Sequence, residues 1–170
     1  MPSEGLPLAT GRMRQARLPT VNDTRAWGAL LGALLRAGDL VVLTGDLGAG
    51  KTSLTQGIAN GLGVRGPITS PTFVIARTHP SLVGGPDLVH VDAYRLGGLA
   101  ELDDLDLDAS LQDAVTVVEW GHGLAEQLSD GYLEVTLRGH DVRTVDLVCH
   151  GARWTDPGAG ALLDDLMSLA

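Results

Sequence analysis

Eight consecutive residues, Gly45 to Thr52, have the types and the spacing of a phosphate-binding loop. They read GDLGAGKT and match the pattern GxxxxGK(S/T). Glycines permit positive φ and keep side chains away, so that successive backbone N–H groups can converge on phosphate oxygens. Lys51 supplies a flexible point charge for the β- and γ-phosphates, and the Thr52 hydroxyl suits the coordination shell of Mg²⁺. The pattern predicts a site for a nucleoside triphosphate and its magnesium ion.

Lys51 is also the single lysine of the chain, because the other eleven of its 12 basic residues are arginines. In a sequence rich in Gly, Ala, Leu and Val, this bias is typical of GC-rich coding. Lysine was kept where the larger, more rigid guanidinium fork would not fit a phosphate loop. With no second lysine, a guanine-reading NKxD segment cannot exist, and no DxxG occurs either. ATP is therefore the expected nucleotide.

Two acidic residues follow buried strands and are candidates to organise the metal. Asp92 comes after LVHV and Glu119 comes after TVV, although either could be an ordinary solvated carboxylate at a strand end. Between them and the phosphate loop, the segment ITSPTF carries the hydroxyls of Thr69, Ser70 and Thr72. Such a segment can sense the γ-phosphate, or it can simply be a turn held by proline.

The elements that must position these residues alternate between short apolar strands and helices. Strands are expected at 12–18, 40–44, 73–78, 88–96, 114–120, 132–137 and 142–149, and helices at 20–38, 54–64, within 99–113, near 123–128 and from 158 onward. This alternation predicts an α/β fold. With the phosphate loop, it indicates a P-loop NTPase of three layers, with a mostly parallel central sheet and an antiparallel edge.

The chain is expected to form a single P-loop ATPase domain over residues 12–153. Residues 1–11 are expected to be a disordered leader, and residues 154–170 a loosely attached tail. No apolar run has the length of a membrane span, and the N-terminus has no secretory signal pattern. Cys149, the only cysteine, lies in the apolar stretch VDLVC and is expected to fill the core. These features favour a cytoplasmic protein.

The net charge of -9 argues against a protein that grips nucleic acid directly. Phosphate neutralisation by a basic patch normally supplies most of the affinity for nucleic acid. Here the arginines are scattered, apart from Arg12, Arg14 and Arg17 near the start. Any role in a nucleic-acid pathway would therefore be exercised through a partner.

Four segments in order, GDLGAGKT, TSPTF, HVDAYRL and VVEW, resemble the bacterial TsaE family over roughly residues 15–150. That family comprises small P-loop ATPases required to form threonylcarbamoyladenosine in tRNA. The resemblance implies that Lys51, Asp92 and Glu119 are catalytic, and that Thr52 and Glu119 are the ligands of Mg²⁺. It implies a nucleotide-sensitive switch at 69–72, and an approach of Thr24 and Arg143 to the adenine.

The implied ATP-binding residues are Thr24, Gly45, Asp46, Leu47, Gly48, Ala49, Gly50, Lys51, Thr52, Ser53, Thr72, Trp120 and Arg143. Two departures from the family pattern concern loop geometry. Asp106 stands where a Leu-Gly step is usual, and Gly121-His122-Gly123 follows Trp120 in place of Pro and an acid. A proton-carrying role for His122 is one interpretation, and an ordinary surface-loop histidine is the other.

The resemblance also implies partners and a slow reaction. The protein would dock on a TsaD–TsaB complex, which transfers the threonylcarbamoyl group, and tRNA would be held by those partners. Intrinsic turnover is expected to be low because no arginine finger is evident in the chain. Two alternatives remain at this stage. One is a small-molecule P-loop kinase in which Arg95 binds the acceptor or stabilises the transition state, and the other is a nucleotide-gated scaffold that barely hydrolyses ATP.

Overall fold

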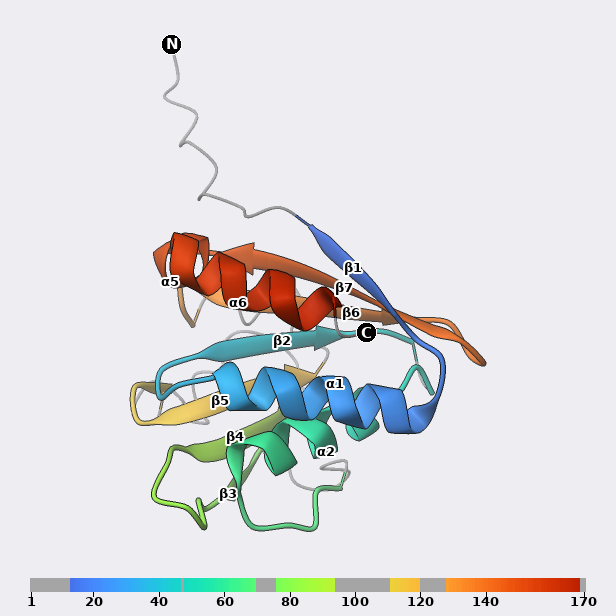
Figure 1. Cartoon of the computed structure of the whole chain (residues 1–170). Coiled ribbons are helices and arrows are strands. Elements are labelled where there is room, and N and C mark those ends of the chain that lie inside the picture. The colour runs from blue at the N-terminus through green and yellow to red at the C-terminus, as the bar shows by residue number, and fades with distance from the viewer. Residues whose placement is uncertain (1–12, 47, 70–75, 94–110, 120–127, 169–170) are drawn as a thin grey trace.

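A computed structural model describes residues 13–46, 48–69, 76–93, 111–119 and 128–168, and these residues build one twisted sheet with helices against it (Figure 1). The described part of the sheet has seven strands in the order β1-β7-β6-β2-β5-β4-β3. Their bounds are β1 (Arg14–Leu18), β2 (Leu40–Thr44), β3 (Ala76–His79), β4 (Asp87–Asp92), β5 (Ala114–Glu119), β6 (Tyr132–Arg138) and β7 (Arg143–His150). Strand β2, which leads into the phosphate loop, therefore lies at the centre.

The centre of the sheet is parallel and both of its edges are antiparallel. Strands β6, β2, β5 and β4 run in one direction, whereas β3 pairs antiparallel with β4, and β7 pairs antiparallel with both β6 and β1. The predicted α/β class, with a mostly parallel sheet and an antiparallel edge, is confirmed. Central strands β2 and β5 are apolar almost throughout, as expected for strands that are covered on both faces.

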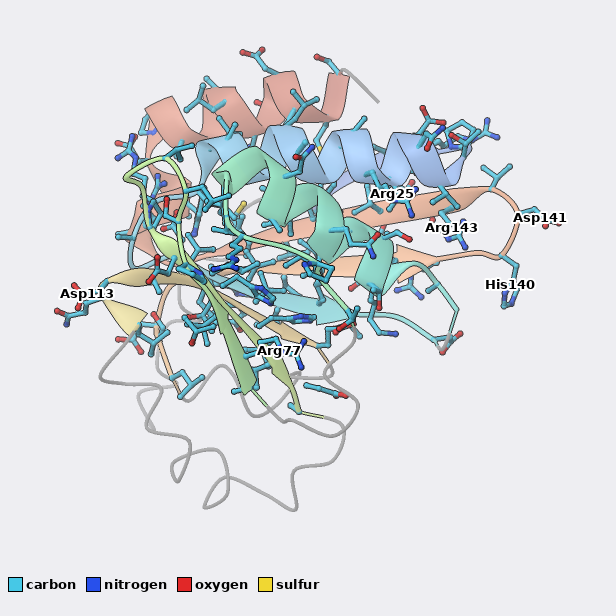
Figure 2. All side chains as sticks on the ribbon, turned by 90° about the horizontal axis from the view of Figure 1, so that it is seen from below. Arg25, Arg77, Asp113, His140, Asp141 and Arg143 are labelled. Atoms are coloured by element: carbon cyan, nitrogen blue, oxygen red, sulfur yellow. The ribbon has the colours of Figure 1, made fainter. Side chains whose placement is uncertain are left out.

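The longer described helices are α1 (Val21–Leu34), α2 (Lys51–Leu62) and α6 (Pro157–Ser168), and a short α5 (Ala152–Thr155) precedes α6. Seen from below, α1, α2 and α6 lie on the same side of the sheet (Figure 2). The helices expected within 99–113 and near 123–128 lie mostly outside the described residues. In the described part of the chain, no helix is both long and apolar enough to span a membrane.

Helix α1 begins with a reciprocal cap and lies very close to α2. The Thr20 hydroxyl accepts a hydrogen bond from the backbone N–H of Asp23, and the Asp23 carboxylate accepts one from the backbone N–H of Thr20. Glycines then let the two helix backbones approach each other. A Cβ atom added at Gly32 would lie 2.4 Å from the Ile58 carbonyl oxygen, and one at Gly57 would lie 2.3 Å from the Arg25 carbonyl oxygen.

Residues near the C-terminus are packed into the core, which corrects the expectation of a loosely attached tail. Trp154, Leu163 and Leu166 are buried in the same apolar cluster as the inner faces of α1 and α2. Arg14 Nε donates to Asp164 Oδ1 at 2.7 Å and ties α6 to β1. The apolar spacing of α6 was visible in the sequence, but the groove that receives it is created only by the tertiary fold.

The single cysteine contributes to the same cluster. Cys149 is fully buried on β7, which confirms its predicted role in the core. Burial raises the pKa of its thiol, and the nearby Arg14 guanidinium only partly opposes this effect. The thiol is therefore kept in its neutral, unreactive form.

Candidate functional site

The predicted phosphate loop connects the end of β2 to the start of α2. Gly50 is the N-cap of α2 and has φ 104°, a left-handed conformation that favours glycine, so α2 can begin at Lys51. At the other end of the loop, Gly45 passes close to β6. A Cβ atom there would lie 2.8 Å from the Leu137 carbonyl oxygen. The loop is thereby held at the positive N-terminal end of α2, where an anion is stabilised.

Lys51 points back into this loop. Its Nζ donates to the carbonyl oxygens of Gly45 at 2.6 Å and Asp46 at 3.0 Å, and the residue is only 6% exposed. Burial lowers the pKa of the Lys51 ammonium group, and the opposing charges of Glu119, Asp46 and Asp92 partly restore it. The ammonium group thus lies among loop carbonyls and carboxylates, where phosphate oxygens can take over its hydrogen bonds.

The two candidate acids, Asp92 and Glu119, lie side by side at the ends of adjacent strands beside the loop. Glu119, the last residue of β5, is paired in register with Leu43 of β2 on one side and with Asp92 of β4 on the other. Glu119 is 4% exposed, whereas Asp92 is half-buried. Because β2, β5 and β4 are parallel, both carboxylates lie at the same edge of the sheet as the phosphate loop.

A histidine that the sequence analysis did not single out belongs to this group. His90 of β4 is fully buried, and its Nε2 lies 2.6 Å from Glu119 Oε2. The signal was present in LVHVD, where His90 occupies an inward position between Leu88 and Asp92 on one face of the strand. A buried strand position normally carries an apolar residue, so a polar side chain there indicates a specific partner.

Arg143 reaches the loop from the start of β7. Its Nε donates to the Ala49 carbonyl oxygen at 2.7 Å, and its Nη2 donates to the Gly48 carbonyl oxygen at 3.2 Å. Figure 2 labels Arg143, with His140 and Asp141 in the adjoining turn. In this structure the guanidinium group braces the phosphate loop, and its approach to adenine stays a prediction.

Thr24 is 1% exposed, and its hydroxyl donates to the Thr20 carbonyl oxygen at 3.3 Å inside the first turn of α1. Its approach to adenine also stays a prediction.

Thr52 and Ser53 are half-buried in the first turn of α2, next to the loop. Beside the loop, toward β6, lies an open pocket of about 460 Å³. It is lined by Thr44, Gly45, Asp46, Glu134, Thr136, Leu137, Arg138 and Gly139.

Several predicted residues lie outside the described ranges. They are Leu47 of the phosphate loop, Ser70, Pro71 and Thr72 of the predicted switch, Trp120 after β5, Arg95 of the kinase alternative, and the departures Asp106 and Gly121 to Gly123. Their assignments remain predictions. Of the predicted switch residues, Thr69 is described, and its hydroxyl accepts a hydrogen bond from Arg77 Nη1 at 3.5 Å.

The residues beside the loop fit a magnesium ion that shares its coordination with phosphate oxygens. Within the described ranges, no cluster of three or more His, Cys, Asp or Glu side chains could hold a metal ion by itself. Mg²⁺ in nucleotide sites typically uses one or two carboxylates, waters and substrate phosphates, and has no complete protein cage. The hydroxyl of Thr52 and the carboxylate of Glu119 are hard oxygen donors of the kind it prefers.

The fold and the loop together define a P-loop protein of the α/β class. The family model for "Threonylcarbamoyl adenosine biosynthesis protein TsaE" matches residues 18–145. The chain belongs to the TsaE family.

Named relatives and a solved structure agree with this assignment. The tRNA threonylcarbamoyladenosine biosynthesis protein TsaE of Streptomyces coelicolor is 56% identical over 145 residues, which cover 81% of this chain and 98% of the relative. The protein of the same name from Bacillus subtilis is 38% identical, over 84% of this chain and 90% of the relative. The crystal structure of YdiB from Bacillus subtilis superposes with a TM-score of 0.70 at 30% identity, and covers 93% of this chain and 96% of that one.

Proposed function

We propose that this protein binds ATP with Mg²⁺ and hydrolyses it slowly, as an accessory protein in the formation of N6-threonylcarbamoyladenosine in tRNA. The observation that carries this proposal is the convergence of Lys51, Glu119 and Asp92 at the N-terminal end of α2. The tRNA pathway is supported by family membership, because the relatives are named for the biosynthesis of threonylcarbamoyladenosine in tRNA.

Each residue at this edge of the sheet has a distinct task in the proposal. The ammonium group of Lys51 would exchange the carbonyl oxygens of Gly45 and Asp46 for phosphate oxygens. The Thr52 hydroxyl and the Glu119 carboxylate would hold Mg²⁺, which when bound neutralises charge on the β- and γ-phosphates. Asp92, half-buried beside Glu119, would accept a hydrogen bond from the attacking water.

The partners in this proposal are TsaD and TsaB. A net charge of -9 makes the surface a poor match for tRNA phosphates, so tRNA would be held by the partner proteins. The cytoplasm, where tRNA is modified, is the proposed location. Slow turnover is part of the proposal. The guanidinium group of Arg143 is engaged by the loop carbonyls, so it would not act as an arginine finger on the γ-phosphate.

The test measures ATP binding, turnover and complex formation with one protein preparation. Calorimetry with and without Mg²⁺ should show binding that strengthens when the metal is present. ATP turnover should be slow for the protein alone and faster with TsaD and TsaB, and a pull-down with these two proteins should depend on ATP. Stoichiometric phosphoryl transfer to a small molecule, with no stimulation by TsaD and TsaB, would instead identify a kinase. Absence of ATP binding would contradict the nucleotide site itself.

A further inference from the structure

We propose that His90 is a positioning residue that holds the carboxylate of Glu119 in place for Mg²⁺. This inference rests on the proposed function, because it assigns Glu119 to the metal. Its structural basis is the hydrogen bond between His90 Nε2 and Glu119 Oε2, 2.6 Å long, between adjacent parallel strands. His90 itself would contact neither the metal nor the nucleotide.

His90 is fully buried, and its hydrogen bond to Glu119 explains why a histidine occupies this core position. The side chain is 0% exposed, and among the described residues its second ring nitrogen, Nδ1, has no hydrogen-bond partner. A buried polar group without a partner is destabilising, and an apolar side chain at position 90 would avoid that cost. The remaining polar contact of the ring is with Glu119, so the histidine serves the carboxylate rather than the core.

The same contact indicates which ring nitrogen donates. A carboxylate accepts hydrogen bonds, so Nε2 must carry the hydrogen that is donated to Oε2. Nδ1 has no hydrogen-bond partner among the described residues, so the ring makes its polar contact through Nε2 alone. With Oε2 bound to His90, Oε1 is the carboxylate oxygen left free to face a cation.

Glu119 also needs this support because it is almost completely buried. Glu119 is 4% exposed. Among the described residues of the loop, Lys51 supplies the positive charge that interacts with its carboxylate. In the proposed function, Lys51 turns toward the phosphates, so its hold on the carboxylate weakens when the nucleotide binds. His90 approaches from the neighbouring strand β4, on a rigid element of the sheet, and would keep the carboxylate oriented throughout.

The test compares two substitutions at position 90 that differ in the donor. His90→Gln keeps an N–H donor near the position of Nε2, whereas His90→Phe keeps a ring but removes the donor. For His90→Phe, the Mg²⁺ concentration needed for half of the maximal effect on ATP affinity should rise by about 10- to 100-fold, as for other residues that orient metal ligands. Metal-free ATP affinity should be unchanged, and His90→Gln should recover most of the loss.

His79→Phe is the matched control, because His79 is a second buried histidine with one unpartnered ring nitrogen, and its other nitrogen contacts the Arg65 carbonyl oxygen. Its Mg²⁺ requirement should equal that of the wild type. A readout without nucleotide is the ¹⁵N spectrum of the His90 ring, which should show the Nε2–H tautomer and change in Glu119→Gln. A ring protonated at Nδ1 alone would contradict the proposal.

The measurements on wild type and variants distinguish failure of this inference from failure of the proposed function. Wild-type protein that binds no ATP, or binds it equally with and without Mg²⁺, overturns the proposed function and this inference with it. Mg²⁺-dependent binding in the wild type that is lost in Glu119→Ala but kept in His90→Phe overturns the inference alone. An equal loss of metal-free and Mg²⁺-dependent affinity in His90→Phe also overturns it, because that result describes a merely structural residue.

Discussion

The guanidinium group of Arg143 donates a hydrogen bond of 2.7 Å to the carbonyl oxygen of Ala49, and so joins the start of β7 to the phosphate loop across 94 positions of sequence. A second bond, from Arg143 Nη2 to the Gly48 carbonyl oxygen, fixes the same stretch of the loop. The N–H of the peptide group that carries the Gly48 carbonyl, that of Ala49, donates to the Asp46 carbonyl oxygen at 3.0 Å, so Arg143 braces a turn that is also closed within the loop. The hairpin of β6 and β7 therefore helps to preorganise the loop.

Arg143→Ala is expected to weaken ATP binding by about tenfold, since loss of one or two charge-assisted hydrogen bonds removes about 1–2 kcal/mol of preorganisation. Titration calorimetry measures this change directly. Arg17→Ala is the matched control, because Arg17 is paired in register with Thr144, beside Arg143, and is exposed on the other face of the sheet. Equal affinities for the two variants would show that Arg143 does not support the loop.

The parts of this site that could be predicted from sequence are those encoded locally. The phosphate loop is a contiguous motif, and Glu119 and Asp92 could be recognised because each ends a run of apolar residues. Their alignment in register depends on the strand order β2-β5-β4, which is determined by pairing between distant segments. The contacts of His90 with Glu119 and of Arg143 with the loop likewise arise only when the sheet forms, and no local pattern encodes them.

Lys51→Ala is expected to weaken ATP binding by about 100-fold and to abolish hydrolysis, because the ammonium group makes charge-assisted hydrogen bonds to phosphate, each worth about 1.5–3 kcal/mol. Lys51→Arg should not restore turnover. The Lys51 side chain is 6% exposed and lies within the loop, and a guanidinium fork is too large for that space. Binding and turnover are measured together, with circular dichroism to check the fold. Unchanged hydrolysis in Lys51→Ala would refute the assigned site.

Glu119→Ala is expected to weaken Mg²⁺-dependent ATP binding much more than metal-free binding, because the carboxylate is assigned to the metal. The measurement is ATP affinity with Mg²⁺ and with a chelator in its place. Asp113→Ala provides the control, since it removes the same charge just before the opposite end of β5, where the side chain is exposed (Figure 2). Equal losses with and without metal would remove Glu119 from the metal site.

Gly32→Ala tests whether the close approach of α1 holds the helix that begins at the phosphate loop. The added Cβ would lie 2.4 Å from the Ile58 carbonyl oxygen of α2, so the helices must separate. We expect a loss of about 1–3 kcal/mol in the free energy of unfolding, although alanine is the better helix former by about 1 kcal/mol. A Cβ atom added at Gly160 in α6 would lie 3.6 Å from Arg14 Nη2, an ordinary van der Waals contact, so Gly160→Ala should be neutral or stabilising. Denaturant unfolding compares the two variants, and equal stabilities would mean that the helices adjust without cost.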